Sequence, residues 1–311
     1  MSLTVFIIVL NWNRFEDTKE CLESLAKINK ANFCIEVLVV DNCSNNIELA
    51  KLENFVSSFR SSVFNLSLVK NKRNLGFAGG NNVGLRMAVE KSADYILVLN
   101  NDTYVDKNFL KNLIDVGMTD KKIGALSPKI YFAKGYEYHK NRYKKKDLGR
   151  VIWYAGGDID WDNVYASNHG VDQMDVGQFD QVCKTDFATG ACVLYKTQAI
   201  LESGFFDERY FLYLEDTDLS LRIQKNGFKL LYVPSAVIWH KVAQSSRIGS
   251  DLNDYYITRN RLLFGFKYAN LRAKFALFRE SMKFLFFGRE WQRRGVIDFY
   301  AGNFGKGSFK V

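Results

Sequence analysis

Short, nearly uninterrupted hydrophobic runs alternate with amphipathic segments along the first hundred residues of the chain. Runs of this kind are typical of strands buried on both faces of a parallel sheet, because helices cover both faces. The amphipathic segments between them have the spacing of helices, and the alternation predicts βαβ units with right-handed crossovers. The expected strands are 3–10, 36–40, 67–69 and 94–99, and the expected helices are 15–26 and 47–59.

Polar side chains stand at the ends of three predicted strands. Asn11 ends the first, Asp41 ends the second, and the stretch 100–102 (Asn-Asn-Asp) ends the fourth. The carboxyl ends of parallel strands meet at one edge, where open α/β sheets bind ligands, and a carboxylate there suits a hard divalent cation. Asp102 is therefore a candidate metal ligand. The alternative is that Asn-Asn-Asp-Thr only forms a turn and caps a helix from about Asp106.

A glycine-rich segment at 74–84 (Asn-Leu-Gly-Phe-Ala-Gly-Gly-Asn-Asn-Val-Gly) leads into an expected helix at 85–91. Glycines allow close approach of the backbone, and free N–H groups at a helix start suit a diphosphate. Gly76 and Gly79 are the candidates for this role. The segment lacks Gly-Lys-Ser/Thr and the strand that precedes a dinucleotide fingerprint, so by itself it does not identify a nucleotide site.

A second acidic cluster, Glu215, Asp216 and Asp218, follows an aromatic stretch more than a hundred residues later. Helical spacing after the cluster places the acids in a first turn, where the helix dipole stabilises negative charge, and favourable capping alone would explain them. The aromatic stretch gives a second interpretation, because sugar rings stack on such faces and a neighbouring carboxylate can deprotonate a hydroxyl. The aromatic residues are Phe205, Phe206, Tyr210, Phe211 and Tyr213.

Length and composition are those of a folded protein without a flexible linker. The chain has 311 residues, of which 47% are hydrophobic and only two are prolines, and this predicts one compact body. The five cysteines form no Cys-x-x-Cys pair, and the start has no basic region followed by a cleavage site, so we expect a reduced, cytosolic protein. The three histidines are too scattered to predict a zinc site.

Positive charge is concentrated near the C-terminus. From residue 261 to 311, 11 Lys and Arg stand against three acids, among many phenylalanines. A basic aromatic helix predicts contact with an anionic membrane surface. Nucleic acid would attract the same charge, and inward packing of the aromatics on the body is a third interpretation. No uncharged run approaches the roughly 18 to 20 residues needed to span a bilayer.

The segments described above, taken in order, resemble the motifs of the family 2 glycosyltransferases, particularly the rhamnosyltransferase-like branch that includes galactofuranosyltransferases. The resemblance covers about residues 3 to 265 and is carried by the ordered set rather than by any one stretch. The matching stretches are 39–44 (Val-Val-Asp-Asn-Cys-Ser), 74–81, 99–102 (Leu-Asn-Asn-Asp), 187–192 (Phe-Ala-Thr-Gly-Ala-Cys), 204–208 (Gly-Phe-Phe-Asp-Glu), 215–219 (Glu-Asp-Thr-Asp-Leu) and 239–240 (Trp-His).

The resemblance implies a GT-A fold, which is a single Rossmann-like α/β domain with a mixed, mainly parallel central sheet flanked by helices. It places this domain at 1–265, with a nucleotide-binding half at 1–105 and an acceptor half at 106–265. A basic aromatic helical extension would follow at 266–311. The implied activity is inverting transfer of a sugar from a nucleotide-diphosphate donor to a glycan or lipid-linked acceptor in cell-surface polysaccharide synthesis.

The resemblance also implies roles in donor binding. Asp41 would read the uracil or thymine of the donor, with Asn11 and Asn74 nearby. The small residues Thr189 and Gly190 would make room for the donor sugar, although a tight turn is the simpler interpretation of that stretch. A basic segment at 134–150 would be a solvated loop, or it would bind a lipid-linked diphosphate or fold over the donor.

The metal motif Asp-x-Asp of the family corresponds to the stretch 100–102, in which Asn replaces the first Asp. Asn101 and Asp102 would face the diphosphate. His240, after a strand at 229–233 and a turn at Pro234, would supply a further ligand for Mg²⁺ or Mn²⁺. Without the resemblance, His240 would be interpreted as a core histidine.

Asp216 matches the base position of the family and would take the proton of the acceptor hydroxyl. Glu215 and Asp218 would orient the base or the acceptor, and their charge would raise the proton affinity of the base.

Donor, acceptor and partners are less accessible from the sequence. By resemblance the donor is dTDP-rhamnose first and a UDP-sugar second, and the protein is cytoplasmic, with attachment to the inner face of the membrane and homo-oligomerisation both open. A non-catalytic nucleotide-sugar or glycan-binding module is the alternative, against which the complete acidic cluster argues. A nucleic-acid-binding protein is not expected, because the chain lacks a recognition motif and acids line the inferred cleft.

Overall fold

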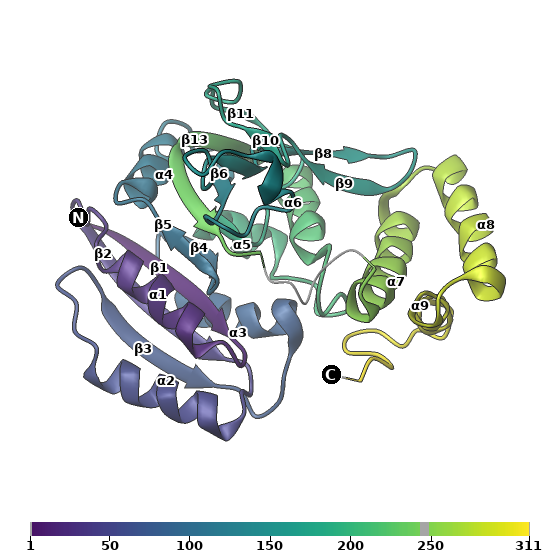
Figure 1. Cartoon of the computed structure of the whole chain (residues 1–311), viewed down its shortest axis with the longest axis horizontal. Helices are drawn as coiled ribbons and strands as arrows, with labels where there is room; N and C mark the ends of the chain where they lie inside the picture. Colours follow the sequence, from purple (N-terminus) through teal and green to yellow (C-terminus); the bar gives the residue numbers. More distant parts are fainter. Residues whose placement is uncertain (1, 243–248, 311) are drawn as a thin grey trace.

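Parallel strands form the N-terminal half of an extended sheet (Figure 1). The computed structural model of the protein describes residues 2–242 and 249–310. The predicted βαβ alternation is confirmed, because these strands pair in parallel in the spatial order β4-β1-β2-β3 with helices between them in sequence. The elements are β1 (Leu3–Asn11), α1 (Phe15–Leu25), β2 (Phe33–Asp41), α2 (Asn46–Ser58), β3 (Asn65–Lys70), α3 (Gly76–Glu90) and β4 (Tyr95–Asn100).

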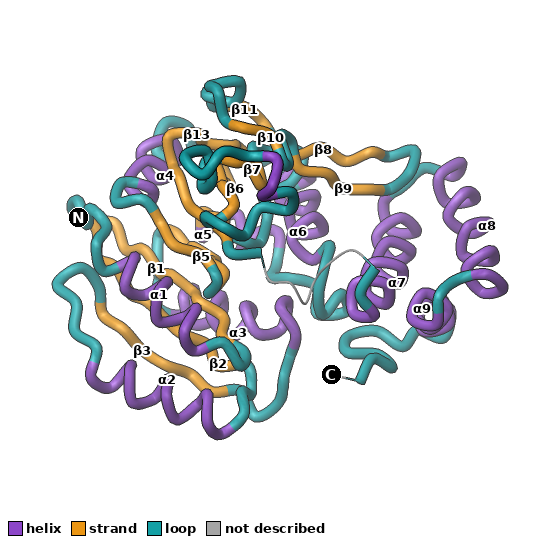
Figure 2. Tube along the Cα trace, viewed as in Figure 1, coloured by secondary structure: helices purple, strands orange, loops and turns teal. Residues whose placement is uncertain are grey.

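The second half adds further strands to the same sheet (Figure 2), and most of these strands pair antiparallel. β12 (Cys192–Lys196) lies between β4 and β6 (Ile123–Phe132) and is antiparallel to both. β13 (Lys229–His240) is parallel to β6 and antiparallel to β5 (Thr103–Val105). The sheet is therefore mixed, as predicted, but parallel pairs are concentrated in the first half rather than predominating throughout.

The remaining elements are helices, further strands of the main sheet and the small hairpin β8–β9. They are α4 (Phe109–Gly117), the 3-10 turn η1 (Lys140–Arg142), β7 (Val151–Tyr154), β8 (Gly157–Asp160), β9 (Tyr165–Asn168), β10 (Gln173–Met174), β11 (Cys183–Lys184), α5 (Thr197–Ser203), α6 (Glu215–Lys225), α7 (Asp251–Tyr268), α8 (Leu271–Phe287) and α9 (Glu290–Tyr300).

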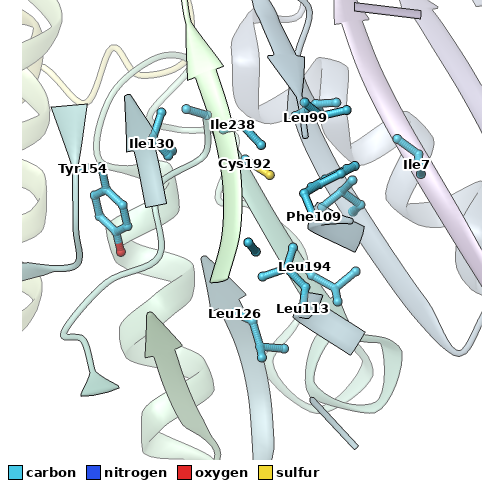
Figure 3. Packing of buried hydrophobic residues seen from close by; sticks show 14 of the residues in the cluster. Ile7, Leu99, Phe109, Leu113, Leu126, Ile130, Tyr154, Cys192, Leu194 and Ile238 are labelled. Atoms are coloured by element: carbon cyan, nitrogen blue, oxygen red, sulfur yellow. The ribbon is translucent and has the colours of Figure 1, made fainter. Parts of the chain in front are cut away.

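Side chains of β1 alternate between two core clusters. Val5, Ile7 and Val9 belong to a cluster shared with α1, α2 and α4, whereas Phe6 and Ile8 belong to a cluster shared with α3, α5 and α6. Figure 3 shows part of the first cluster, in which α4 packs against β4, β6, β12 and β13. Helices on both faces explain why the strand is hydrophobic at nearly every position.

The C-terminal helices α7, α8 and α9 lie together at the end of the molecule away from β3 (Figure 1). α7 runs without interruption across residue 265, where the resemblance placed a domain boundary. The end of the chain folds back, so that Phe309 packs against Tyr255 and Tyr256 of α7 and Trp291 of α9. The extension therefore packs onto the body in part, while α8 leaves most of its phenylalanines exposed.

α3 begins at Gly76 rather than at residue 85, so the glycine-rich segment is itself helical. A Cβ on Gly80 would lie 2.6 Å from the Leu10 side chain, and one on Gly84 would lie 2.6 Å from the Ile8 side chain. The glycines therefore allow α3 to lie close to β1. Glycine is a poor helix former, which is why the sequence pattern did not predict this helix start.

β13 also extends further than predicted. It continues through Pro234 to His240, because a register shift between Val233 and Val237 takes the proline out of the regular ladder. The alternative that residues 100–103 cap a helix from about Asp106 is not observed, since β5 follows this turn and α4 begins at Phe109.

The close approach of α3 to the loop before α6 leads to a prediction about stability. Gly76 has φ +73°, and a Cβ there would lie 2.4 Å from the carbonyl oxygen of Phe211. We expect Gly76→Ala to lower the free energy of unfolding by roughly 2–5 kcal/mol, from left-handed strain plus overpacking. Gly227→Ala is the matched control, because Gly227 has φ +84° with nothing within 4 Å; it should cost only about 1–2 kcal/mol. Equal losses in urea denaturation would contradict the steric argument.

Candidate functional site

The predicted polar strand ends meet at one edge of the sheet. Asn11 lies opposite Asp41 in the β1–β2 ladder, and Leu10 lies opposite Asn100 in the β1–β4 ladder. Asp102 follows in the turn between β4 and β5. The convergence predicted from the hydrophobic pattern is confirmed.

Asp41 is held by a network of hydrogen bonds. Its Oδ1 accepts from Asn11 Nδ2 at 2.8 Å and from Ser44 Oγ at 2.6 Å, and its Oδ2 accepts from the Ser44 N–H at 3.0 Å. Asn11 Oδ1 in turn accepts from Thr18 Oγ1 at 2.8 Å. Asn11 and Asp41 are only 0% and 1% exposed, so they form a fixed wall at this end of the site rather than an open contact surface.

Asn101 belongs to the same network. Its Nδ2 donates to Thr18 Oγ1 at 2.9 Å and to the Arg14 carbonyl at 3.4 Å. The structure therefore places Asn101 near Asn11, and within the stretch 100–102 only Asp102 contributes a carboxylate.

Strand pairing brings Asp102 into contact with His240. His240 lies opposite Thr103 in the β13–β5 ladder, and the Lys241 N–H donates to the Asp102 carbonyl at 2.8 Å. His240 Nε2 lies 3.0 Å from Asp102 Oδ1, and Trp153 packs edge-on to the imidazole at 4.7 Å between ring centroids. Burial raises the pKa of Asp102, but the charge and hydrogen bond of His240 outweigh it and hold this pKa below its usual value.

Asp102 and His240 fit a divalent cation in their donor chemistry. Carboxylate oxygen and imidazole nitrogen are both suitable ligands, and ions that bind phosphates need only one or two protein carboxylates. His240 Nδ1 is buried without a hydrogen-bond partner among the described residues. Across residues 2–242 and 249–310, no three His, Cys, Asp or Glu side chains form a ligand cluster. Phosphate oxygens and water would therefore have to complete the coordination.

Asp216 lies in the first turn of α6 and is half-buried. Its Oδ2 accepts from the Gly190 N–H at 2.8 Å, and its Oδ1 accepts from the Thr217 N–H at 2.7 Å. Burial raises the pKa of Asp216, although these hydrogen bonds act in the opposite direction. A general base is most effective when its pKa is close to the working pH. The raised pKa of Asp216 is therefore closer to neutral pH than that of an ordinary carboxyl group.

The segment 189–191 links the two acidic clusters in space. The Ala191 carbonyl accepts from the Asn100 N–H at 2.9 Å, while the neighbouring Gly190 N–H donates to Asp216. A Cβ on Gly190 would lie 2.8 Å from the ring of Phe77 in α3, so a side chain there would displace this ring. The end of β4 and the start of α6, more than a hundred residues apart in sequence, therefore contact the same short segment.

The acidic neighbours of Asp216 have different environments. Glu215 is buried, its Oε2 has no partner among the described residues, and burial followed by the charge of Asp216 raises its pKa well above the usual value. Asp218 is fully buried but accepts from Arg222 at 2.8 Å and Lys267 at 2.6 Å. The predicted contact of Asp218 with substrate is not supported, because its carboxylate faces the interior and is paired with two cations.

The loop before α6 has an unusual backbone. Phe211, Tyr213 and Leu214 have φ angles of 63°, 72° and 70°, in the left-handed region that costs non-glycine residues roughly 1–2 kcal/mol each. The Asn260 amide donates to three carbonyls of the loop at 2.8, 2.7 and 2.9 Å. Arg259 donates to two loop carbonyls at 3.2 and 3.0 Å. α7 thus fixes the loop that leads into Asp216.

Sequence reasoning did not identify Arg259 and Asn260 as functional residues. Both are 0% exposed. The available signal was the polar run 258–261 (Thr-Arg-Asn-Arg) between Tyr255-Tyr256 and Leu262-Leu263, because buried polar side chains require partners.

The N-terminus of α3 is covered by the same loop. The N–H groups of Phe77 and Ala78 donate to the Phe211 carbonyl at 2.7 and 3.3 Å. The Gly76 N–H donates to Asn74 Oδ1 at 2.8 Å. The prediction that Gly76 and Gly79 open a diphosphate site through free N–H groups is therefore not supported. Asn74 supports the start of this helix, and its place near the donor stays a prediction.

The aromatic stretch 205–213 mostly packs inside the protein. Phe206 lies edge-on to Phe77 at 5.9 Å, Phe211 stacks on Tyr256 at 5.3 Å, and Tyr210 is fully buried. Phe206, Tyr210 and Phe211 are therefore too buried to stack on a sugar. Phe205 and Tyr213 are half-buried, and for these two rings sugar stacking stays a prediction.

The comparisons with known proteins agree with this geometry. The family model described as "Glycosyl transferase family 2" matches residues 6–174, and the model described as "Glycosyl transferase family group 2" matches residues 95–295. Each of these matches covers more than half of the chain. The protein belongs to the family 2 glycosyltransferases.

Curated relatives are distant. The chain is 26% identical over 190 residues to N-acetylglucosaminyl-diphospho-decaprenol L-rhamnosyltransferase of Mycobacterium tuberculosis, over 58% of this chain and 61% of that protein. It is 23% identical over 260 residues to low-salt glycan biosynthesis hexosyltransferase Agl10 of Haloferax volcanii, over 83% of this chain and 74% of that protein. It is 22% identical over 273 residues to dTDP-rhamnosyl transferase RfbF of Shigella flexneri, over 85% of this chain and 80% of that protein. The match to the mycobacterial protein thus spans about three fifths of that relative.

Solved structures confirm the predicted GT-A fold. GalNAc-T7 with UDP, GalNAc and Mn²⁺ matches 96% of this chain and 55% of its own with a TM-score of 0.66 at 17% identity. TarS 1–349 of S. aureus with UDP-GlcNAc matches 96% and 79% with a TM-score of 0.58 at 16% identity. Among the described residues, no helix is long and apolar enough to cross a bilayer.

The different environments of Glu215 and Asp218 lead to a pH-dependent prediction. The pKa of Glu215 is raised in the folded state, so the unfolded chain releases this proton first and stability falls as pH rises above the unfolded pKa. We expect Glu215→Gln to raise the melting temperature at neutral pH and to lose this advantage in acid, as measured by calorimetry from about pH 4 to 8.

Asp218→Asn is the matched control. It would leave Arg222 and Lys267 without their buried partner, and we expect it to lower stability by roughly 3–5 kcal/mol. A Glu215→Gln protein that is destabilised at neutral pH would contradict the interpretation that Glu215 is an unpaired buried acid.

Proposed function

We propose that the protein is an inverting glycosyltransferase that moves a sugar from a nucleotide-diphosphate donor to a hydroxyl of a glycan or lipid-linked acceptor. The observation that carries the proposal is the contact of segment 189–191 with both the strand end before Asp102 and the carboxylate of Asp216. This arrangement places a candidate diphosphate site and a candidate base on either side of one short segment, as transfer between two bound substrates requires.

The donor would lie along the edge of the sheet. Its base would lie against the wall formed by Asn11 and Asp41, which is rigid because both side chains are buried and hydrogen-bonded. Its diphosphate would lie at Asp102, and its sugar would lie at Gly190, beside the buried Thr189. We favour dTDP-rhamnose and then a UDP-sugar, since one relative is named as a dTDP-rhamnosyl transferase and another as a rhamnosyltransferase.

The proposed reaction is a single displacement. The acceptor oxygen bonds to the anomeric carbon while the bond from that carbon to the diphosphate oxygen breaks, and the hydroxyl proton passes to Asp216. The N–H groups of Gly190 and Thr217 hold this carboxylate in place. A divalent cation bound at Asp102 and His240 would offset the charge of the departing diphosphate.

The names of the relatives, rather than the geometry, support the proposed acceptor class. One relative carries a decaprenol diphosphate in its name, and another is named for glycan biosynthesis. We place this protein in the cytoplasm, in the synthesis of a cell-surface polysaccharide.

Donor binding can be tested by thermal stabilisation. We expect dTDP or UDP with Mn²⁺ to raise the melting temperature, with about 2.7 kcal/mol of stabilisation at a hundred times the dissociation constant, whereas GDP and ADP do not. Asp102→Ala should lose the metal-dependent part. Asp115→Ala, in an exposed pair on α4, is the control and should behave as wild type. No stabilisation by any nucleotide at saturation would contradict the proposed donor site.

The role of Asp216 can be tested separately. Asp216→Asn preserves the shape of the side chain but removes the base, so we expect transfer to fall by roughly 10²–10⁴-fold while stabilisation by the preferred nucleotide with Mn²⁺ is retained. Radiolabelled transfer assays with a lipid-extract acceptor measure the first quantity, and thermal unfolding measures the second. Full activity in Asp216→Asn would rule out this residue as the base.

A further inference from the structure

Helix α8 has an apolar face on each side. Ala273, Leu277 and Ser281 are at most 2% exposed and form its inner face, toward the rest of the protein. Figure 1 shows α8 at the outer end of the molecule, with α7 and α9 on its inner side. The inner face accounts for the packing of α8, so the outer face needs a separate explanation.

The outer face is hydrophobic and exposed to solvent. Leu271 is 85% exposed, Phe275 is 68%, Phe278 is 44% and Phe286 is 73%. Together with the partly exposed Met282, these positions are spaced by three or four residues, which puts them on one side of the helix. A run of exposed large side chains across a whole helix is uncommon in a soluble protein and marks an interaction surface.

Basic side chains border this face. Arg272, Arg279 and Lys283 are exposed and lie along one side of the stripe by helical spacing. Among the described residues, neither Arg279 nor Lys283 has an acidic partner. Between residues 271 and 300, seven Lys and Arg stand against three acids. Arg272 pairs with the exposed Asp162 at 3.0 Å. The surface therefore combines an apolar stripe with net positive charge, of which Arg279 and Lys283 are the unpaired part.

We propose that the outer face of α8 binds the surface of a lipid bilayer that contains anionic headgroups. The phenylalanines would enter the boundary between headgroups and acyl chains, and the basic border would contact the negative headgroups. A second copy of this chain is a poorer occupant, because a symmetric contact through α8 would bring its own basic border against itself. A neutral apolar partner would leave the positive charges without a counterpart.

This inference does not rest on the proposed transferase activity, since it concerns a surface formed by α8 alone. If the proposed function also holds, the surface would bring the protein to membranes in which lipid-linked acceptors lie.

The test is sedimentation of the full chain with vesicles, without nucleotide or metal. We expect binding to vesicles of phosphatidylcholine mixed with phosphatidylglycerol, weak binding to phosphatidylcholine alone, and release by salt. The triple variant Phe275→Ser, Phe278→Ser, Phe286→Ser should lose binding by more than about tenfold. Its control carries serine at Met118, Val176 and Leu201, which are exposed hydrophobic residues outside α8, and should bind as wild type.

A charge variant keeps the proposal testable if the phenylalanine variant folds poorly. Arg279→Gln with Lys283→Gln should weaken binding to anionic vesicles by about thirtyfold, from roughly 1 kcal/mol for each basic side chain. Unchanged binding in both variants would overturn the proposal. So would failure to bind anionic vesicles, or a dimer in light scattering that the phenylalanine substitutions dissociate.

Discussion

The hydrogen bonds from Asn260 to the loop 209–214 are the contacts on which the arrangement of the site depends. One amide group with two N–H bonds serves three carbonyls, so the loop must bring these oxygens to a single point. Three residues adopt left-handed backbone angles to do so. The loop conformation depends on the Asn260 amide. Without this donor, each buried carbonyl would cost about 1–3 kcal/mol, and the strain of the left-handed backbone would have no compensation.

The same loop connects three helices that contribute to the site. The Phe211 carbonyl accepts from the first turn of α3, and the residues after it lead directly into α6 and Asp216. Asn260 belongs to α7, which continues past residue 265 into the segment that the sequence resemblance set apart as an extension. The C-terminal helices are therefore part of the structure that positions Asp216, while α8 within them remains available on its outer face.

The sequence predicted the features that depend on local pattern. Buried strands have continuous hydrophobic runs, so the edge where Asn11, Asp41 and Asp102 meet could be located without coordinates. Features that depend on contacts between distant segments could not be located in this way. The glycines of α3 indicate close packing against β1 rather than a phosphate loop, and the aromatic stretch before α6 fills the interior, because its partners come from α3 and α7. The Asp102–His240 contact was suggested by family resemblance alone, since a register between β5 and β13 is not encoded in either strand separately.

Asp216 and Asp218 show how the environment determines what a carboxylate can do. They lie two positions apart in one helical turn and therefore face different directions. Asp218 points inward, where its carboxylate forms ion pairs with Arg222 and Lys267. Among residues 2–242 and 249–310, the donors to Asp216 are the uncharged Gly190 and Thr217. Asp216 is half-buried beside Gly190, so burial favours its protonated form. The proposed base must be ionised before the reaction and must hold a proton afterwards. The raised pKa of Asp216 suits that cycle, whereas the carboxylate of Asp218 is already engaged by two cations.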